Sequence, residues 1–248
     1  MCSLAAGHRE VEQRGYHHAA ERCGDGQGGG STVGVGKGLA LETGLPIVAV
    51  PTTYAGSEMT PIYGLTEAGV KKTGRDRKVM PKSVIYDVNL TLSLPAKISG
   101  PSGMNAMAHC VEALYAEDAN PIVSLLAEEG IRALAQALPA VIANPSDVEA
   151  RSDAQYGAWL GGTVLGAVSM SIHHKLCHTL GGTFNLPHAE THTIVLPHAL
   201  AYNQGAAPAA YARTKTCRSG RPSMRENSGI LPIYSSPAPR PSHPSAHV

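Results

Sequence analysis

The chain has 248 residues, 43% of them hydrophobic, so it can bury a core as one large domain or two small ones. Its formal net charge of +1 gives no electrostatic basis for binding nucleic acid or a membrane surface. The five cysteines lack CxxC spacing and indicate thiols in a reducing compartment. No apolar run reaches the roughly 18 residues of a membrane helix, and no signal-peptide pattern is visible. We therefore expect a cytoplasmic protein.

The N-terminal third alternates between glycine-rich, apolar and polar segments. Residues 1–27 are polar and predict at most a short helix. Glycines in 28–38 are typical of a turn that leads into a helix and offers backbone N–H groups to a phosphate, although the spacing matches neither GxGxxG nor Walker A. A plain flexible turn is an equal alternative. The apolar run 46–51 predicts a buried parallel strand, and the polar loop 52–60 follows it, where ligands bind in α/β sheets.

Strand material is also predicted at 62–66 and 78–87, with a basic turn at 69–76 between them. From about residue 95 good helix formers dominate, and apolar residues recur with a helical period. The segments predicted to be helical are 102–115, 121–137, 145–168, 171–182 and 193–203.

The ends of these helices carry recognisable signals. Ser146 or Asp147 is expected to cap the third helix, which a glycine pair at 161–162 is expected to interrupt. After Arg213 the chain is rich in Pro, Ser and Arg, so we expect a disordered tail.

Histidines concentrate in residues 171–192. The five in this stretch are His173, His174, His178, His188 and His192. His174 and His178 are four residues apart and share one face of a helix, which the glycine pair at 181–182 is expected to end. Imidazole is the commonest metal ligand and titrates near neutrality. Because an HxxxH pair alone is a weak signal, a helix with surface histidines is the alternative.

Asn105 and His109 form a second pair at helical spacing. Together with His174, His178 and His188 they give five polar groups from three segments that could surround one point. A divalent metal normally has an anionic oxygen ligand, whereas Asn105 offers only a neutral amide oxygen, so we expect weak metal binding.

Five motifs resemble the iron-containing alcohol dehydrogenase family and, within it, the maleylacetate reductase subfamily. The motifs are GGGSTVGVGKGLAL (28–41), PTTYAGSEMTPIYGLTE (51–67), VIYDVNLTLSLP (84–95), SGMNAMAHCVEALYA (102–116) and SIHHKLCHTLGGTFNLPHAETHTIVLPHALAYN (171–203).

The resemblance implies a dehydroquinate synthase-like fold, in which an α/β nucleotide-binding part precedes an all-α domain and the site lies between them. We expect a partial α/β domain at 28–98, a partial helical domain at 99–212, an atypical segment at 1–27 and a disordered tail at 213–248. Both domains are expected to be incomplete, which would leave an unpaired sheet edge and uncovered apolar helix faces and make the chain poorly soluble.

The resemblance also implies a reaction, the reduction of maleylacetate to 3-oxoadipate by NADH or NADPH in aromatic compound degradation. The expected partner is a small dicarboxylate substrate, with a homodimer as the expected assembly and neither nucleic acid nor membrane involved. The alternatives are a metal-dependent alcohol or glycerol dehydrogenase of the same fold, and an inactive fragment with residual nucleotide binding.

Site residues follow from the resemblance position by position. The cofactor contacts that it implies are Gly29, Gly30, Ser31, Thr52, Thr53 and Ser57. The four metal positions for Fe or Zn are Asn105, His109, His174 and His188, with Asn105 where the family has Asp. His178 matches the histidine beside the nicotinamide.

The candidate proton donors are His178 and His109, which would stabilise the developing oxyanion or enolate. Lys175 and His173 are candidates for gripping the two substrate carboxylates, because both can carry positive charge.

Overall fold

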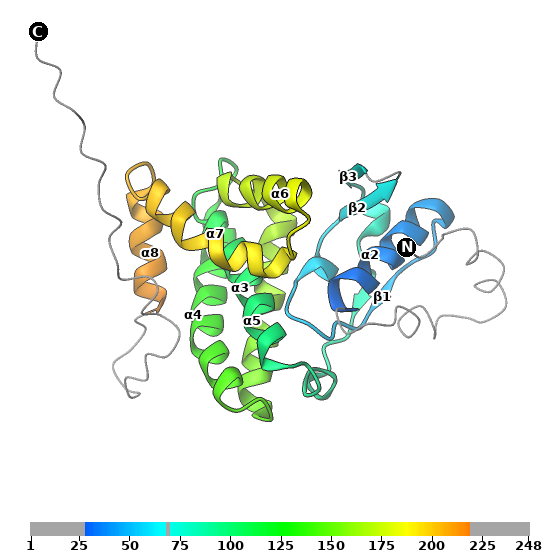
Figure 1. The fold of residues 1–248 in the computed structure, drawn as a ribbon, viewed down its shortest axis with the longest axis horizontal. Helices are drawn as coiled ribbons and strands as arrows, with labels where there is room; N and C mark the ends of the chain where they lie inside the picture. The colour runs from blue at the N-terminus through cyan, green and yellow to red at the C-terminus, as the bar shows by residue number, and fades with distance from the viewer. Residues whose placement is uncertain (1–27, 68–69, 219–248) are drawn as a thin grey trace, which may run out of the picture.

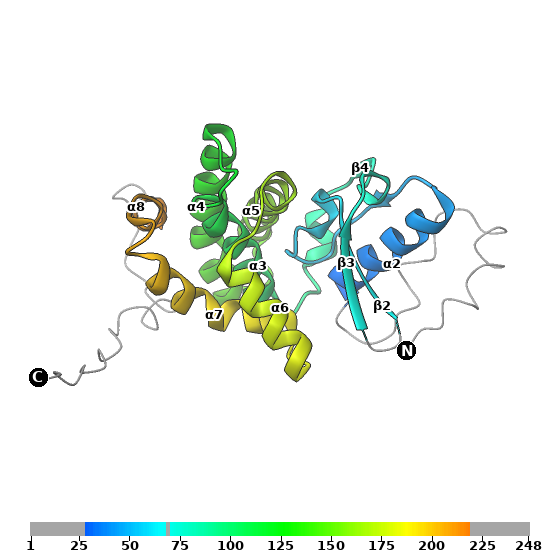
Figure 2. The same cartoon turned by 90° about the horizontal axis from the view of Figure 1, so that it is seen from above.

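The computed structural model describes residues 28–67 and 70–218. Within them an α/β part precedes a helical part, and the chain passes from one to the other at Pro95 (Figures 1 and 2). No helix in the described residues is both long enough and apolar enough to span a bilayer.

The α/β part begins with helix α2 (Gly28–Thr43), so the glycine-rich segment lies within the first turns of a helix. Two short strands, β1 (Val48–Ala49) and β4 (Ser83–Val84), pair in parallel. Strands β2 (Ile62–Glu67) and β3 (Val70–Arg75) form an antiparallel hairpin. The three short 3-10 helices of this part are η2 (Ser57–Met59), η3 (Arg77–Val79) and η4 (Val88–Thr91).

Four sequence predictions in this part need correction. The glycine-rich segment, predicted to be a turn leading into a helix, is helical from Gly28, and the predicted strand 78–87 contains only the two-residue strand β4. The run 46–51 was predicted to be a buried strand; β1 is parallel, but Val48 and Val50 are 54% and 43% exposed, because β1 has a single neighbouring strand in the described chain. The predicted basic turn 69–76 contains strand β3. This segment forms a strand because it pairs with β2, and turn propensities, which consider only neighbouring residues, do not include such cross-strand partners.

The helical part contains six helices among the described residues. They are α3 (Ala96–Ala113), α4 (Pro121–Ala143), α5 (Val148–Ala167), α6 (Ile172–Phe184), α7 (His188–Asn203) and α8 (Pro208–Arg218). Helices α3, α4 and α5 pack against one another, and α7 packs against both α3 and α6.

Small residues bring α3, α4 and α5 close together. A Cβ at Gly103 would lie 2.3 Å from a Leu138 side-chain carbon, and one at Gly161 would lie 2.7 Å from the carbonyl oxygen of Ala106. The chain has a single Phe and a single Trp. Alanine and glycine therefore supply much of the helix packing.

The helix boundaries confirm some end signals and correct others. Asp147 caps α5 through a hydrogen bond from the N–H of Ala150, at 3.0 Å, as predicted. The predicted break at 161–162 is wrong, since α5 is continuous to Ala167. Helix α6 passes through its glycine pair and ends at Asn185, whose φ of 51° is left-handed. Helix α8 extends to Arg218, beyond the predicted start of the disordered tail, and the remainder of that tail lies outside the described residues.

The polar loop after β1 is held between the two parts of the chain. The buried ammonium of Lys37 donates to the carbonyl oxygens of Ser57, Thr60 and Ile62, at 2.7, 2.8 and 2.6 Å. On the other side Gly56, at φ 77°, lies directly against the backbone of Gly162 in α5. Burial lowers the pKa of Lys37 to about 8, although Glu58 raises it. This loop is thus tied to both α2 and α5.

Candidate functional site

Six histidines from three helices gather in one cluster. They are His109 on α3, His173, His174 and His178 on α6, and His188 and His192 on α7. The ring centroids of His109 and His174 lie 5.0 Å apart, and those of His178 and His188 lie 5.9 Å apart with the rings stacked. The predicted site histidines of the three segments therefore lie together.

His192 lies at the centre of this cluster. Its ring centroid is 4.2 Å from that of His188, 4.7 Å from His174 and 4.8 Å from His173. The side chain is fully buried, and neither ring nitrogen has a hydrogen-bond partner. His192 is one of the five histidines of residues 171–192, but no role was predicted for it from the sequence. The signal was its spacing of four residues from His188, which places both rings on one face of α7.

Glu112 on α3 belongs to the site but was not among the residues predicted from the sequence. Its fully buried carboxylate accepts hydrogen bonds from the backbone N–H groups of Ser171, His173 and His174, at 3.2, 2.9 and 3.3 Å. The same carboxylate lies 2.5 Å from Nδ1 of His174. Glu112 follows Asn105 and His109 at positions i+7 and i+3, so one helical face carries all three, and this spacing was the available signal.

The contact with Glu112 fixes which nitrogen of the His174 ring faces a carboxylate. Because a carboxylate accepts, Nδ1 of His174 is the donor in this contact, so in the neutral form of the ring the lone pair is on Nε2. Burial alone would raise the pKa of Glu112, but the hydrogen bond and charge of His174 and the amide of His173 lower it below its ordinary value. A carboxylate behind an imidazole is the usual arrangement for a metal-ligating or proton-accepting histidine.

Several buried polar atoms of the cluster have no hydrogen-bond partner. They are Oδ1 of Asn105, Nδ1 of His109, Nδ1 of His173, Nε2 of His174 and both ring nitrogens of His192. Unsatisfied buried groups are costly and call for a ligand, ion or water. With neutral donors of this kind, Asn105, His109 and His174 fit a divalent cation or a hydrogen-bonding substrate.

Burial keeps the inner imidazoles neutral. It lowers the pKa of His109 well below its ordinary value, and the neighbouring rings, His174 first, lower it further. Burial likewise lowers the pKa of His192, with His188 as the next cause. In His173 burial lowers the pKa although the hydrogen bond with the His192 carbonyl raises it.

The two residues predicted to bind the substrate carboxylates, His173 and Lys175, lie in different environments. His173 is fully buried, its Nε2 lies 3.0 Å from the carbonyl oxygen of His192, and its lowered pKa disfavours a positive charge. Its predicted role in gripping a carboxylate is therefore wrong, because residue type alone does not report burial. Lys175, two residues later, is exposed on α6.

The predicted cofactor residues lie in α2 and the loop after β1. Gly29, Gly30 and Ser31 belong to the first turn of α2. In the loop, Thr52 is exposed, Thr53 is half-buried and the hydroxyl of Ser57 is buried without a partner.

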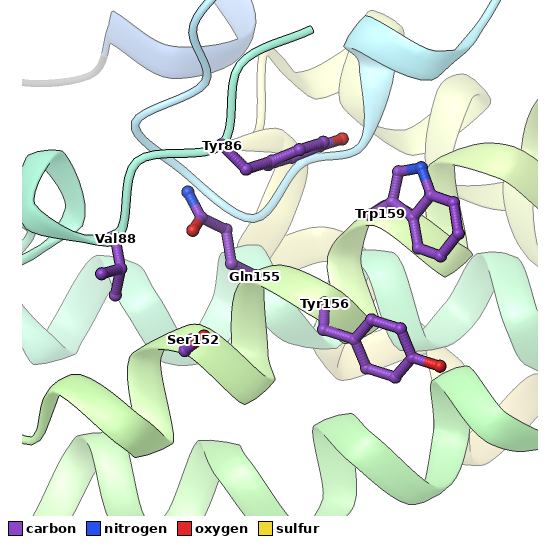
Figure 3. Close-up of a pocket in the computed structure, with 6 residues that line it drawn as sticks. All are labelled: Tyr86, Val88, Ser152, Gln155, Tyr156 and Trp159. Carbon is purple, nitrogen blue, oxygen red and sulfur yellow. The ribbon is translucent and has the colours of Figure 1, made fainter.

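A cavity of about 300 Å³ lies elsewhere, between the loop after β4 and helix α5 (Figure 3). Its lining residues are Tyr86, Val88, Ser152, Gln155, Tyr156 and Trp159. It contains none of the clustered histidines. This cavity was not predicted from the sequence, because its walls come from two segments that are more than 60 residues apart in the chain.

Two family models match the chain. One, described as the Fe-containing alcohol dehydrogenase family, C-terminal, matches residues 100–227, and one described as iron-containing alcohol dehydrogenase matches residues 26–88. The chain is 66% identical over 186 residues to a maleylacetate reductase of Burkholderia cepacia. The matched region covers 75% of this chain and 53% of that protein. The chain thus spans about half the length of the curated relatives it matches.

Solved structures show the same architecture. A maleylacetate reductase from Rhizobium sp. strain MTP-10005 is 58% identical, with a TM-score of 0.75, over 78% of this chain and 55% of that one. An alcohol dehydrogenase from Oenococcus oeni is 27% identical with a TM-score of 0.74, over 77% of this chain and 56% of that one.

Proposed function

Since this chain belongs to the Fe-containing alcohol dehydrogenase family, we propose that it carries the catalytic histidine cluster of an NAD(P)H-dependent maleylacetate reductase, which forms 3-oxoadipate. Two findings support the proposal: the high identity to maleylacetate reductases, and the convergence of imidazoles from α3, α6 and α7.

The cofactor half of the site is proposed at the start of α2. The first N–H groups of a helix lack partners within that helix, and they favour a pyrophosphate. Gly29, Gly30 and Ser31 occupy this turn, and we propose that Thr52, Thr53 and Ser57 contact the remainder of the cofactor. When bound, a reduced nicotinamide supplies a hydride.

The proton-handling half of the site is the histidine cluster. Glu112 accepts from Nδ1 of His174, so in the neutral form of this ring Nε2 is the nitrogen that can accept. His178 is exposed and lies one helical turn further along α6, where its ring can donate a proton to the developing enolate. His109 is buried and its pKa is lowered, so where no metal is bound its neutral ring can donate a hydrogen bond to the oxyanion. Lys175 is the proposed partner of a substrate carboxylate.

A divalent cation at the family positions would be held by Asn105, His109, His174 and His188. Such a cation acts as a Lewis acid on a carbonyl oxygen. The unpartnered buried atoms of Asn105, His109 and His174 have suitable chemistry, but no carboxylate is among these four residues.

The test is a pair of measurements on the purified chain. Fluorescence titration with NADH measures cofactor binding, and loss of NADH absorbance on adding maleylacetate measures turnover. Turnover with maleylacetate but not with simple alcohols and NAD would support the reductase. Cofactor binding without any turnover would overturn the proposed activity and favour the inactive fragment.

A further inference from the structure

We propose that this chain has an imidazole-only transition-metal site formed by His178, His188 and His192, which shares His188 with the family positions but uses none of Asn105, His109 and His174. These three residues offer one ring nitrogen each, and the three atoms lie within 4.8 Å of one another. The site joins the middle of α6 to the first two turns of α7.

His192 anchors the site. It is fully buried, and both of its ring nitrogens lack a partner. A buried polar group without a partner is costly, so a bound cation would remove a penalty that the protein otherwise carries. His188 lies four residues earlier on the same helix, with ring centroids 4.2 Å apart.

The exposed partners make the site accessible and adjustable. His178 and His188 are both exposed, so an ion can arrive from solvent and keep an open coordination position. Zinc–nitrogen bonds of about 2.0–2.1 Å place tetrahedral ligand atoms roughly 3.4 Å apart, which requires the imidazoles to close by a small amount. Rotation of two exposed side chains can provide that closure.

A second group, His173, His174 and His192, has similar spacing but is a poorer candidate. All three residues are buried. Nε2 of His173 already lies 3.0 Å from a carbonyl oxygen, and Nδ1 of His174 is held by Glu112. The ion would have to lose its entire water shell to enter.

The chemistry of the ligands determines which metals bind. Glu112 is engaged by His174 and the first turn of α6, so it is not available as an anionic ligand. Three neutral imidazoles suit Zn²⁺, Co²⁺, Ni²⁺ and Cu²⁺, whereas Mg²⁺ and Ca²⁺ require oxygen ligands.

The experiment is a Co²⁺ titration of the untagged full chain, followed by ligand-field bands in the visible spectrum. We expect the bands to saturate at one tightly bound equivalent of Co²⁺ per chain. Zn²⁺ should displace this Co²⁺ and abolish the bands, whereas Mg²⁺ should not. Alanine substitution of His178, His188 or His192 should weaken binding by about tenfold or more. The matched control is His198→Ala, which removes an exposed histidine from the same helix α7 and should leave the titration unchanged.

Asn105→Ala separates this site from the family positions. It should preserve the Co²⁺ bands, whereas their loss in Asn105→Ala with retention in His178→Ala would overturn the proposal. Absence of strong Co²⁺ binding, or binding that survives all three alanine substitutions, would overturn it as well. Because His178 and His188 are exposed, their variants keep the test valid if circular dichroism shows that His192→Ala does not fold.

Discussion

Glu112 supports two features of the site at the scale of a single residue. Its carboxylate accepts N–H groups from the first turn of α6, and it orients the ring of His174. A carboxylate near a helix N-terminus is favoured by the helix dipole, and here it is also fully buried. The position of α6 and the chemistry of His174 therefore depend on the same side chain of α3.

Replacing Glu112 is expected to destabilise the fold. Glu112→Ala leaves three amides and an imidazole without their acceptor, which should lower the free energy of unfolding by about 3–5 kcal/mol. Glu112→Gln should cost less, because its amide oxygen still accepts. Urea unfolding followed by circular dichroism measures both. Glu117→Gln, an exposed neighbour, is the control, and equal stability of Glu112→Ala and the unsubstituted chain would contradict the role assigned to the carboxylate.

His178 is the residue on which the proposed proton transfer depends. If the chain reduces maleylacetate, His178→Ala should lower turnover by about 100-fold or more, the usual contribution of a positioned general acid. His198→Ala removes an exposed histidine outside the cluster and should keep normal turnover. Steady-state NADH oxidation decides the point, and turnover of His178→Ala close to that of the unsubstituted chain would refute this assignment.

At the scale of elements, the loop after β1 is positioned by a backbone contact with α5. A Cβ at Gly162 would lie 2.2 Å from the carbonyl oxygen of Gly56, a separation that atoms do not adopt. Gly56 itself has a φ of 77°, which other residues rarely tolerate. The loop and the helical part can approach this closely only because both positions lack side chains.

Gly162→Ala is expected to push the loop away from α5 and to destabilise the chain by about 1–3 kcal/mol. Gly182→Ala is the matched control, since this helical glycine has nothing within 4 Å of its added Cβ. That substitution should instead stabilise the chain by up to about 1 kcal/mol. Thermal unfolding of the two variants tests the contact, which is disproved if both midpoints shift in the same direction by the same amount.

At the scale of the whole molecule, the buried histidines link stability to pH. The pKa values of His109, His173 and His192 are all lowered in the folded state, chiefly by burial, from an ordinary value of 6.5. Below that pH the unfolded chain binds protons that the folded chain does not. Stability is therefore fully present above pH 6.5 and is lost as the pH falls below it.

Each such histidine contributes a slope of about 1.4 kcal/mol per pH unit. The free energy of unfolding, measured in urea between pH 7.5 and 5.5, should fall with pH at a rate that corresponds to more than one proton taken up on unfolding. The pKa of Glu112 is also lowered in the folded state, from an ordinary value of 4.5. The stability that Glu112 contributes is therefore lost only near and below pH 4.5. A stability that does not change from pH 7.5 to 5.5 would show that the cluster is solvated or charged.

Local spacing in the sequence was sufficient for much of the candidate site. The i, i+4 pairs Asn105/His109 and His174/His178 follow from helical geometry alone, and residue type limited the cap of α5 to Ser146 or Asp147, of which Asp147 is the cap. The motifs also indicated the family, which the family models confirm. These features depend on residues within one or two helical turns.

Only the tertiary structure decided which polar groups are buried and which rings meet. The central position of His192, the carboxylate of Glu112 behind His174, and the burial of His173 all depend on how α3, α6 and α7 pack. The pairing of β3 with β2 and the exposure of Val48 likewise depend on neighbouring elements. A periodic pattern identifies a shared face of one helix, but contacts between elements distant in sequence determine what that face meets.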